Sequence, residues 1–514
     1  MLKWLPHRLR PSAVYDSLTT NLPHILMGFT DFLFPPSTPL FPPAATVLTY
    51  LESYADHFNL RPHIHFNTSV ISAEYSLNGI SPSGRKWNIS TRSVDSEQID
   101  HFNFDWLMVC NGHYSVPRYP PTPGLSTWVA SDKVSHSITY RNPSLLPLPS
   151  SAKVLVMGGG PSGQDIVADL LSSPLISQVI HSTSTPPTIA NENPKLINRP
   201  RASQFFTDSS TVQFCDSSIE SSISYCILAT GFKTSFPFLS DDYLHPSIPP
   251  PIPPLPDMSI LHNTSYGIFP LARHLFSFSG AAHKPNIAFP GLLVGVAPLP
   301  LTQIQARAAL ALFEELDKDP ENSKMDWTQE SLVIPARNEK LKIQIADGDL
   351  NLNDVTSEVP LSLEEKIAKK WYRFSGMEQY DYRDSLVKLV DRLSSTSSSS
   401  SSSAPAPASS PCVLWSSLPS SSTSSTPYPA TTATISTTTS LHSSNFISRF
   451  LCKQWERDIY THKEILRRTW QALERSGEVE EWVRGVGEGE DPEKEWVELM
   501  EKVIKRGFEI EGGK

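Results

Sequence analysis

Residues 153–165 read KVLVMGGGPSGQD, an apolar run that leads directly into a glycine-rich turn. The apolar residues before the glycines predict a buried strand. In the pattern Gly158-x-Gly160-x-x-Gly163, the first glycine permits a tight turn. The second lets the backbone approach a pyrophosphate, and the third lets helix and strand pack closely. The helix expected at 164–172 would turn its partly positive N-terminus towards the phosphates. A glycine-rich turn without a ligand is the alternative interpretation.

The residues after this helix bear on the choice of dinucleotide. A strand expected at 178–182 completes a strand–helix–strand unit. NAD sites usually carry an acidic residue about 20 positions after the glycines. Residues 180–185 read IHSTST and contain no acid, which favours NADP by elimination. Ser182 and Thr183, together with His181, are candidate donors to a 2′-phosphate, and a solvated loop is the alternative interpretation of the Ser182–Thr183 pair. Arg199 or Arg201 is a further candidate that could move towards the 2′-phosphate and bind it.

Composition narrows the class of protein. The chain has 514 residues, a net charge of −10 and only five cysteines, with no CxxC pair. An acidic chain without a long basic run argues against a nucleic-acid partner. So few cysteines argue against a disulfide scaffold and favour a reducing compartment, which predicts a cytoplasmic protein. No stretch of about 18 apolar residues occurs, so no membrane span is expected. His63 and His65 lack a third ligand at suitable spacing, so no metal site is predicted.

Periodicity and composition predict the other elements. Helical spacing predicts a helix at 47–59, and helices are also expected at 303–316 and over 446–508. Strands are expected at 64–76, 87–91, 104–110, 224–229 and 287–296, with a turn at 82–84. The proline-rich residues 245–257 predict an extended loop. The Ser/Thr/Pro-rich residues 394–444 predict a disordered insertion, because they cannot bury enough apolar surface.

Several further motifs occur in a fixed order around the glycine turn. They are Val14–Pro23 (VYDSLTTNLP) with Met27-x-Phe29-x-Asp31-Phe32, Cys110–Tyr114 (CNGHY) with Pro117, Pro120, Pro123 and Gly124, His136–Ser137 with Tyr140–Arg141, Ala229–Phe232 (ATGF) with Phe236–Phe238, and Gln303-x-Gln305-Ala306-Arg307. Together with Gly158–Asp165, this series resembles the flavin-containing monooxygenases in the order of that family, from about residue 11 to 315. An ordered series is more specific than any single motif.

The resemblance implies an α/β fold with two Rossmann-like dinucleotide-binding domains. The NADPH domain would be inserted in an incomplete FAD domain, and a C-terminal helical segment would follow. The implied divisions are 1–142 (partial FAD domain), 143–232 (NADPH domain), 233–393 (remainder of the FAD domain), 394–444 (insertion) and 445–514 (C-terminal helices). No oligomeric state follows from the sequence.

The resemblance also implies an activity. NADPH would reduce FAD, the reduced flavin would capture molecular oxygen as a C4a-hydroperoxide, and a soft nitrogen or sulfur atom of a small molecule would attack it. Asn21 is implied as the catalytic residue, because an amide donates and accepts hydrogen bonds without charging; a turn residue before Leu-Pro is the alternative. The implied cofactor-binding residues beyond the three glycines are Pro161, Ser162, Asp165, Ser182, Thr183, Asn111, Gly112, Thr230, Gly231, Gln303 and Gln305.

The chain departs from the family pattern at its start. The family opens with a strand and glycine motif that hold the FAD pyrophosphate, whereas the family-like residues here begin near Pro11. A strand–helix–strand unit needs about 30 residues, so the FAD phosphate-binding unit is expected to be missing, through truncation or degeneration. The alternative function is therefore a catalytically impaired relative that binds the nicotinamide nucleotide. A flavin-independent NADPH reductase ranks last, because no proton donor for a carbonyl site is evident.

Overall fold

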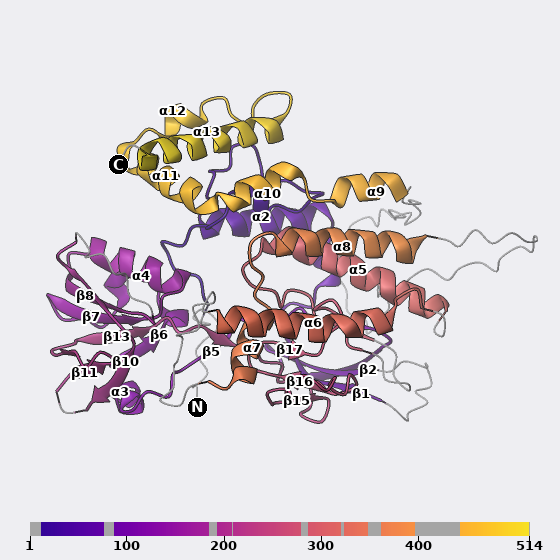
Figure 1. The fold of residues 1–514 in the computed structure, drawn as a ribbon, viewed down its shortest axis with the longest axis horizontal. Helices are drawn as coiled ribbons and strands as arrows, with labels where there is room; N and C mark the ends of the chain where they lie inside the picture. Colours follow the sequence, from indigo (N-terminus) through magenta and orange to yellow (C-terminus); the bar gives the residue numbers. More distant parts are fainter. Residues whose placement is uncertain are drawn as a thin grey trace, which may run out of the picture.

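The computed structural model describes residues 12–76, 87–184, 193–207, 209–278, 286–319, 323–347, 361–395 and 443–512. These residues form three regions (Figure 1): a strand-rich lobe around β7 and α4, a larger lobe around α5, α6 and α8, and a layer of C-terminal helices over α2. In the described part of the chain, no helix is long and apolar enough to cross a membrane. The predicted turn at 82–84 and nearly all of the predicted insertion, residues 396–442, lie outside the described residues.

The first lobe is built on a five-stranded parallel sheet in the order β6-β13-β7-β8-β9. Its strands are β6 (Val134–His136), β7 (Ala152–Met157), β8 (Ile176–Ser182), β9 (Leu196–Arg199) and β13 (Tyr225–Leu228). The strands predicted before the glycines, at 178–182 and at 224–229 are thus confirmed. The sheet also includes β6, which precedes residue 143, and the domain boundaries remain a prediction.

Both faces of this sheet are covered, as its apolar strands require. Val154 and Val156 of β7 face α4 (Pro161–Ser172), whereas Leu155 and Met157 face the opposite side. Successive residues of a strand point to opposite faces, so one continuous apolar strand supplies two cores. The second side is covered by α3 (Leu125–Ala130) and by the antiparallel sheet of β10 (Ala202–Phe206), β11 (Thr211–Phe214) and β12 (Ile219–Glu220).

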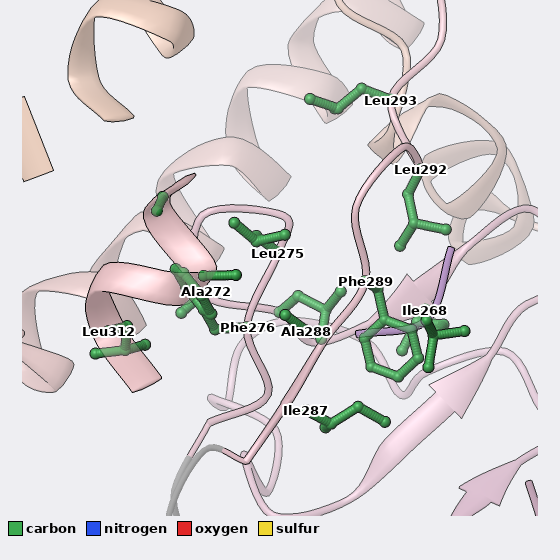
Figure 2. Close-up of a cluster of buried hydrophobic side chains, with 14 of the residues drawn as sticks. Ile268, Ala272, Leu275, Phe276, Ile287, Ala288, Phe289, Leu292, Leu293 and Leu312 are labelled. Carbon is green, nitrogen blue, oxygen red and sulfur yellow. The ribbon is translucent and has the colours of Figure 1, made fainter. Parts of the chain in front are cut away.

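The second lobe combines small sheets with long helices. Its strands are β1 (Thr68–Tyr75), β2 (Trp87–Ser93), β3 (Ile99–Phe104), β4 (Leu107–Met108), β5 (Val116–Pro117), β14 (Phe232–Lys233), β15 (Leu244–His245), β16 (Leu261–Asn263), β17 (Ile268–Phe269) and β18 (Ile287–Ala288). Its helices are α5 (Pro298–Lys318), α6 (Trp327–Ala346), α7 (Leu363–Trp371) and α8 (Glu378–Ser394). Figure 2 shows the centre of its core, where Phe276, Phe289 and Leu312 are buried together.

The C-terminal helices pack on the N-terminal part of the chain. They are α9 (Ser443–Phe450), α10 (Gln454–Thr461), α11 (Lys463–Ser476), α12 (Val479–Val483) and α13 (Pro492–Gly512). One shared core joins Trp470 and Trp496 of these helices to Leu26 of α1 (His24–Met27) and Tyr50 of α2 (Ala44–His57). The predictions of a helix at 47–59, a helix at 303–316 and C-terminal helices over 446–508 are therefore confirmed.

Two predicted strands are wrong over most of their length. Beyond Phe104, which ends β3, residues 104–110 and 287–296 contain only the two-residue strands β4 and β18 among the described residues. These two strands pair with each other, and Ala288 also forms an isolated bridge with Phe276. Pro290 interrupts the second run, and Gly291 and Gly295 turn the chain with φ of +82° and +76°. The strand predicted at 64–76 begins only at Thr68, because Asn67 adopts φ of +52°. Apolar character alone did not reveal these turns.

Candidate functional site

The three glycines of the predicted motif serve different purposes in the structure. Gly158 adopts φ of +129°, and a Cβ at this position would lie 2.1 Å from the carbonyl oxygen of Ala229. A Cβ at Gly163 would lie 2.0 Å from the carbonyl oxygen of Gly158. A Cβ at Gly160 would meet nothing within 4 Å. The fold itself therefore requires the first and third glycines, whereas the middle one borders open space.

That open space lies at the N-terminus of α4. The helix begins at Pro161 with Gly160 as its N-cap, and no side chain caps it. Here the chain leaves β7, with β8 on one side in the sheet and β13 on the other. Ligands of open α/β sheets bind at such a point, beyond the carboxyl ends of the strands. The unsatisfied N–H groups and the dipole of the first helical turn favour an anion there.

The end of β8 brings the predicted His181, Ser182 and Thr183 to this edge. His181 Nε2 donates to the carbonyl oxygen of Gly158 at 2.9 Å, which anchors the turn, and burial lowers the pKa of His181. Ser182 is buried, and its Oγ donates to the carbonyl oxygen of Pro200 at 2.9 Å. The buried Oγ1 of Thr183 has no hydrogen-bond partner among the described residues. Thr183 therefore offers a hydroxyl that the described residues leave unused at this edge.

The two arginines considered for the 2′-phosphate already have partners. Arg199 lies at the end of β9 and forms an ion pair with Glu220 at 2.5 Å, and Lys153 binds the other oxygen of Glu220 at 2.6 Å. Burial acts to raise the pKa of Glu220, but hydrogen bonds from the two cations outweigh it and lower that pKa. Arg201 donates to Cys215 Sγ at 3.4 Å. Neither guanidinium is directed at an open site by these contacts.

Residues 229–232, which follow β13, lie on the other side of the glycine turn. Thr230 Oγ1 donates to the carbonyl oxygen of Arg118 at 2.5 Å, and Gly231 adopts φ of +78°. His136 Nε2 donates to the carbonyl oxygen of Gly231 at 3.0 Å, and burial lowers the pKa of His136 to about 4. The structure thus brings Thr230 and Gly231 beside the glycine turn. It adds His136 as a neutral anchor, whose role the sequence did not reveal.

Asp165, predicted at the cofactor, is engaged with the N-terminal part of the chain. Tyr15 donates its hydroxyl to Asp165 Oδ2 at 2.5 Å, and one helical turn later Asp169 accepts from Tyr140 at 2.5 Å. The two tyrosine rings meet edge to face, with centroids 6.0 Å apart. Burial and the neighbouring carboxylates raise both phenol pKa values, so the tyrosines remain donors. The two pairs fasten the outer face of α4.

Gln303 and Gln305, which were predicted to border the flavin, form hydrogen bonds to different parts of the protein. Gln303 of α5 donates to Asp31 Oδ1 at 2.5 Å and accepts from the Thr30 N–H at 2.9 Å. Gln305 is fully buried and accepts from the Gly291 N–H at 2.9 Å, while its Nε2 donates to the Tyr382 hydroxyl at 3.0 Å. Both amides are therefore occupied by the protein.

The remaining predicted residues lie in loops. Asn111 donates to the carbonyl oxygen of Ser235 at 3.0 Å, and Gly112 adopts φ of +71° with open space around it. Asn21 is exposed, in the bend before α1. Its catalytic role and its alternative as a turn residue both remain open. Sequence reasoning missed Asp31, which Arg307 binds at 2.9 Å beside Gln303; its place in the quoted Met27–Phe32 string was the available signal.

The glycine turn and its surroundings can be compared with the shape of a dinucleotide cofactor. The open cradle at Gly160 and the unpaired Thr183 hydroxyl fit the phosphates and ribose of a dinucleotide. In the described ranges, the Gly158–Gly163 turn is the one glycine-rich strand-to-helix turn, so these residues supply a pyrophosphate cradle for one dinucleotide. They do not supply a second one for FAD. No group of three or more His, Cys, Asp or Glu side chains suited to a metal ion occurs in the described part either.

Known proteins resemble the chain over much of its length. The family model described as flavin-binding monooxygenase-like matches residues 9–195. A flavin-containing monooxygenase of Arabidopsis thaliana, FMO GS-OX-like 7, is 30% identical over 355 residues, which cover 63% of this chain and 67% of that protein. The thiol-specific monooxygenase of Saccharomyces cerevisiae is 27% identical over 317 residues, covering 59% of this chain and 65% of that protein.

A solved structure shows the same fold. The S-allyl-L-cysteine S-oxygenase of Allium sativum superimposes with a TM-score of 0.55 and 24% identity, over 74% of each chain. This likeness confirms the expected α/β class. The two curated alignments span about two thirds of their relatives' length. By the ordered motifs, the geometry of the glycine turn and these similarities, the chain belongs to the flavin-containing monooxygenase family.

Proposed function

We propose that this chain binds NADPH at the glycine turn and, with FAD and molecular oxygen, oxygenates a soft sulfur or nitrogen atom of a small molecule. The observation that carries the nucleotide site is the open cradle at Gly160, where the uncapped N-terminus of α4 meets the carboxyl edge of a parallel sheet. FAD and NADPH are the cofactors of the family to which the chain belongs. The few cysteines favour the cytoplasm as its location.

The proposed nucleotide site assigns distinct tasks to the chain's own residues. The backbone of Gly160, Ser162 and Gly163, with Pro161 at the first helical position, would hold the pyrophosphate. Thr183 would donate its unpaired hydroxyl to the 2′-phosphate. The Thr230–Gly231 return would border the nicotinamide side, and Gly158 and Asp165 would fix the turn and the helix. Ser182 would support Thr183 from the core.

A second group of residues would border the flavin, which supplies the oxygen-activating chemistry when it is bound. Asn111, Gly112, Gln303 and Gln305 are proposed here as part of its surroundings, through loops held by the hydrogen bonds described above. Asn21 is proposed as the residue that approaches the reacting atoms, because its exposed amide can hydrogen-bond without taking up or releasing a proton. The names of the relatives in yeast and garlic favour sulfur over nitrogen.

One observation favours a second candidate function. The described residues supply one pyrophosphate cradle, and the amides of Gln303 and Gln305 already bind the protein. A relative that binds the nicotinamide nucleotide without oxygenating a substrate would have these features.

One preparation separates the two functions. The purified 514-residue chain is mixed with FAD, free cofactor is removed, and the visible absorption spectrum is recorded. NADPH oxidation and oxygen consumption are then followed with and without a small thiol. Stoichiometric flavin together with thiol-stimulated NADPH oxidation supports the monooxygenase. Tight NADPH binding without retained flavin or oxygen consumption supports the second candidate.

The two hydroxyls at the end of β8 provide a prediction for NADPH binding. Thr183→Val removes a buried hydroxyl that has no partner among the described residues, so stability should not fall, whereas the affinity for NADPH should drop about tenfold relative to NADH. Ser182→Ala is the comparison variant: it removes a hydrogen bond to Pro200, should cost about 1 kcal/mol of stability, and should change the NADPH preference less than Thr183→Val does. Thermal melting and titration of both nucleotides test this. An unchanged NADPH preference in Thr183→Val would contradict the assignment.

A further inference from the structure

Residues 12–20, which we call the N-terminal strap, run along the nucleotide-binding lobe. Besides the Tyr15–Asp165 hydrogen bond to α4, the Asp16 N–H donates to the carbonyl oxygen of Arg141 at 3.0 Å. Asn142 Nδ2 donates to Asp16 Oδ2 at 2.6 Å. The first half of the strap is thus fastened to the helix that begins at the glycine turn and to the chain segment that precedes β7.

The second half of the strap is fastened to the start of α2. The Thr20 N–H donates to the carbonyl oxygen of Pro42, and the Ala44 N–H donates to that of Leu18, each at 3.0 Å. Thr19 forms an isolated antiparallel bridge with Pro43. Asn21, the proposed catalytic residue, follows directly. Any displacement of the strap would therefore move both the support of α4 and the position of Asn21.

One side chain from the C-terminal helices, that of Arg467, contacts the place where the strap pairs with the segment before α2. Arg467 of α11 donates from Nη2 to Thr19 Oγ1 at 2.6 Å, and its guanidinium lies 4.5 Å from the ring centroid of Phe41. Arg467 therefore contacts both the strap, at Thr19, and the segment before α2, at Phe41, although 448 residues separate it from Thr19. In Figure 1 the helix that carries it lies above the strand-rich lobe.

Arg467 is more buried than an ordinary surface arginine, and this affects its electrostatics. Burial lowers its pKa, against the longer-range attraction of Glu474 and Asp165. The guanidinium contacts the Thr19 hydroxyl and the Phe41 ring, which are both neutral, and its charge is attracted by Asp165 of α4. A charged donor makes a stronger hydrogen bond than a neutral one.

We propose that Arg467 is a positioning residue, which couples the C-terminal helices to the nucleotide-binding turn by holding the N-terminal strap against α4. The consequence for catalysis rests on the proposed function, whereas the positioning itself does not. Loss of Arg467 should loosen residues 12–20 and the first turn of α4, and should weaken binding of the nicotinamide nucleotide about fivefold or more.

The test uses the full chain and three substitutions. Arg467→Met removes the charge and keeps an apolar stem, Arg467→Lys keeps the charge without the planar group, and Thr19→Val removes the accepting hydroxyl. Arg468→Met is the matched control on the next residue, because Arg468 is 66% exposed and its ion pair with Glu511 lies at the surface. Amide hydrogen exchange is measured over 12–22 and 160–166, NADPH binding by titration, and stability by melting.

The proposal expects faster exchange in both segments and weaker NADPH binding for Arg467→Met and Thr19→Val, with Arg468→Met like the wild type. Their effects should be less than additive in the double variant. Arg467→Lys should lose less binding than Arg467→Met, because an ammonium group keeps a charged donor for the Thr19 hydroxyl. Exchange over 12–22 and 160–166 that matches Arg468→Met overturns the proposal, even if the melting temperature falls. Faster exchange in a chain whose wild type does not bind NADPH upholds the positioning role and instead overturns the proposed function.

Discussion

Gly158→Ala should strongly destabilise the nucleotide-binding lobe, whereas Gly160→Ala should leave its stability unchanged and weaken nucleotide binding. The first substitution puts a Cβ 2.1 Å from the backbone oxygen of Ala229, at a φ of +129° that side chains rarely adopt. Overpacking against backbone and the strained dihedral together should cost about 3 to 5 kcal/mol. That is a large part of the stability of an ordinary domain.

Gly160→Ala separates ligand binding from folding. Its backbone has φ of −75°, and a Cβ there meets nothing within 4 Å, so the melting temperature should stay close to that of the wild type. The added methyl group would occupy the cradle proposed for the pyrophosphate, and NADPH affinity should fall about tenfold to a hundredfold. Circular dichroism melting and NADPH titration of the two variants test both statements. A Gly160→Ala variant that binds NADPH normally would show that the phosphates lie elsewhere.

The free energy of unfolding should fall steeply as the pH drops from about 6.5 towards 4. Burial lowers the pKa of His24 and of His136 to about 4, and lowers that of His274 well below its usual value. Well above pH 6.5 the imidazoles are neutral in both states and contribute no pH dependence. Between pH 6.5 and 4 the unfolded chain binds protons that the folded chain does not, so acid favours unfolding. At pH 5, His24 and His136 should each cost about 2 kcal/mol relative to neutral pH.

Urea unfolding at pH 7.5 and pH 5.0 measures this loss. His136→Gln should reduce the difference between the two pH values, and His24→Asn should do the same, although each also removes a hydrogen bond that the imidazole makes. The exposed His63 supplies the control, because His63→Asn should leave the difference as it is. Equal stability of the wild type at the two pH values would contradict the expected neutral state of the buried imidazoles.

The local sequence pattern was sufficient to predict those helices, strands and turns that form from residues close together in the chain. The alternation of Val154 and Val156 with Leu155 and Met157 needs only a strand buried on both faces. The glycine spacing at 158–163 needs only a turn between strand and helix. Both features depend on residues close together in the chain, so the sequence alone determined the parallel sheet, the position of the nucleotide turn and the resemblance to a flavin-containing monooxygenase.

Tertiary structure decided which polar groups remain available in the site. Arg199 is held by Glu220, and Asp165 accepts a hydrogen bond from Tyr15, so neither predicted side chain is free for a ligand. Thr183 Oγ1, in contrast, has no partner among the described residues. The two-residue lengths of β4 and β18 and the contact between Thr19 and Arg467 also arise only after distant segments meet. Periodicity encodes the elements, but pairing between distant residues depends on how the whole chain packs, because each such contact must outweigh the entropy of closing a long loop.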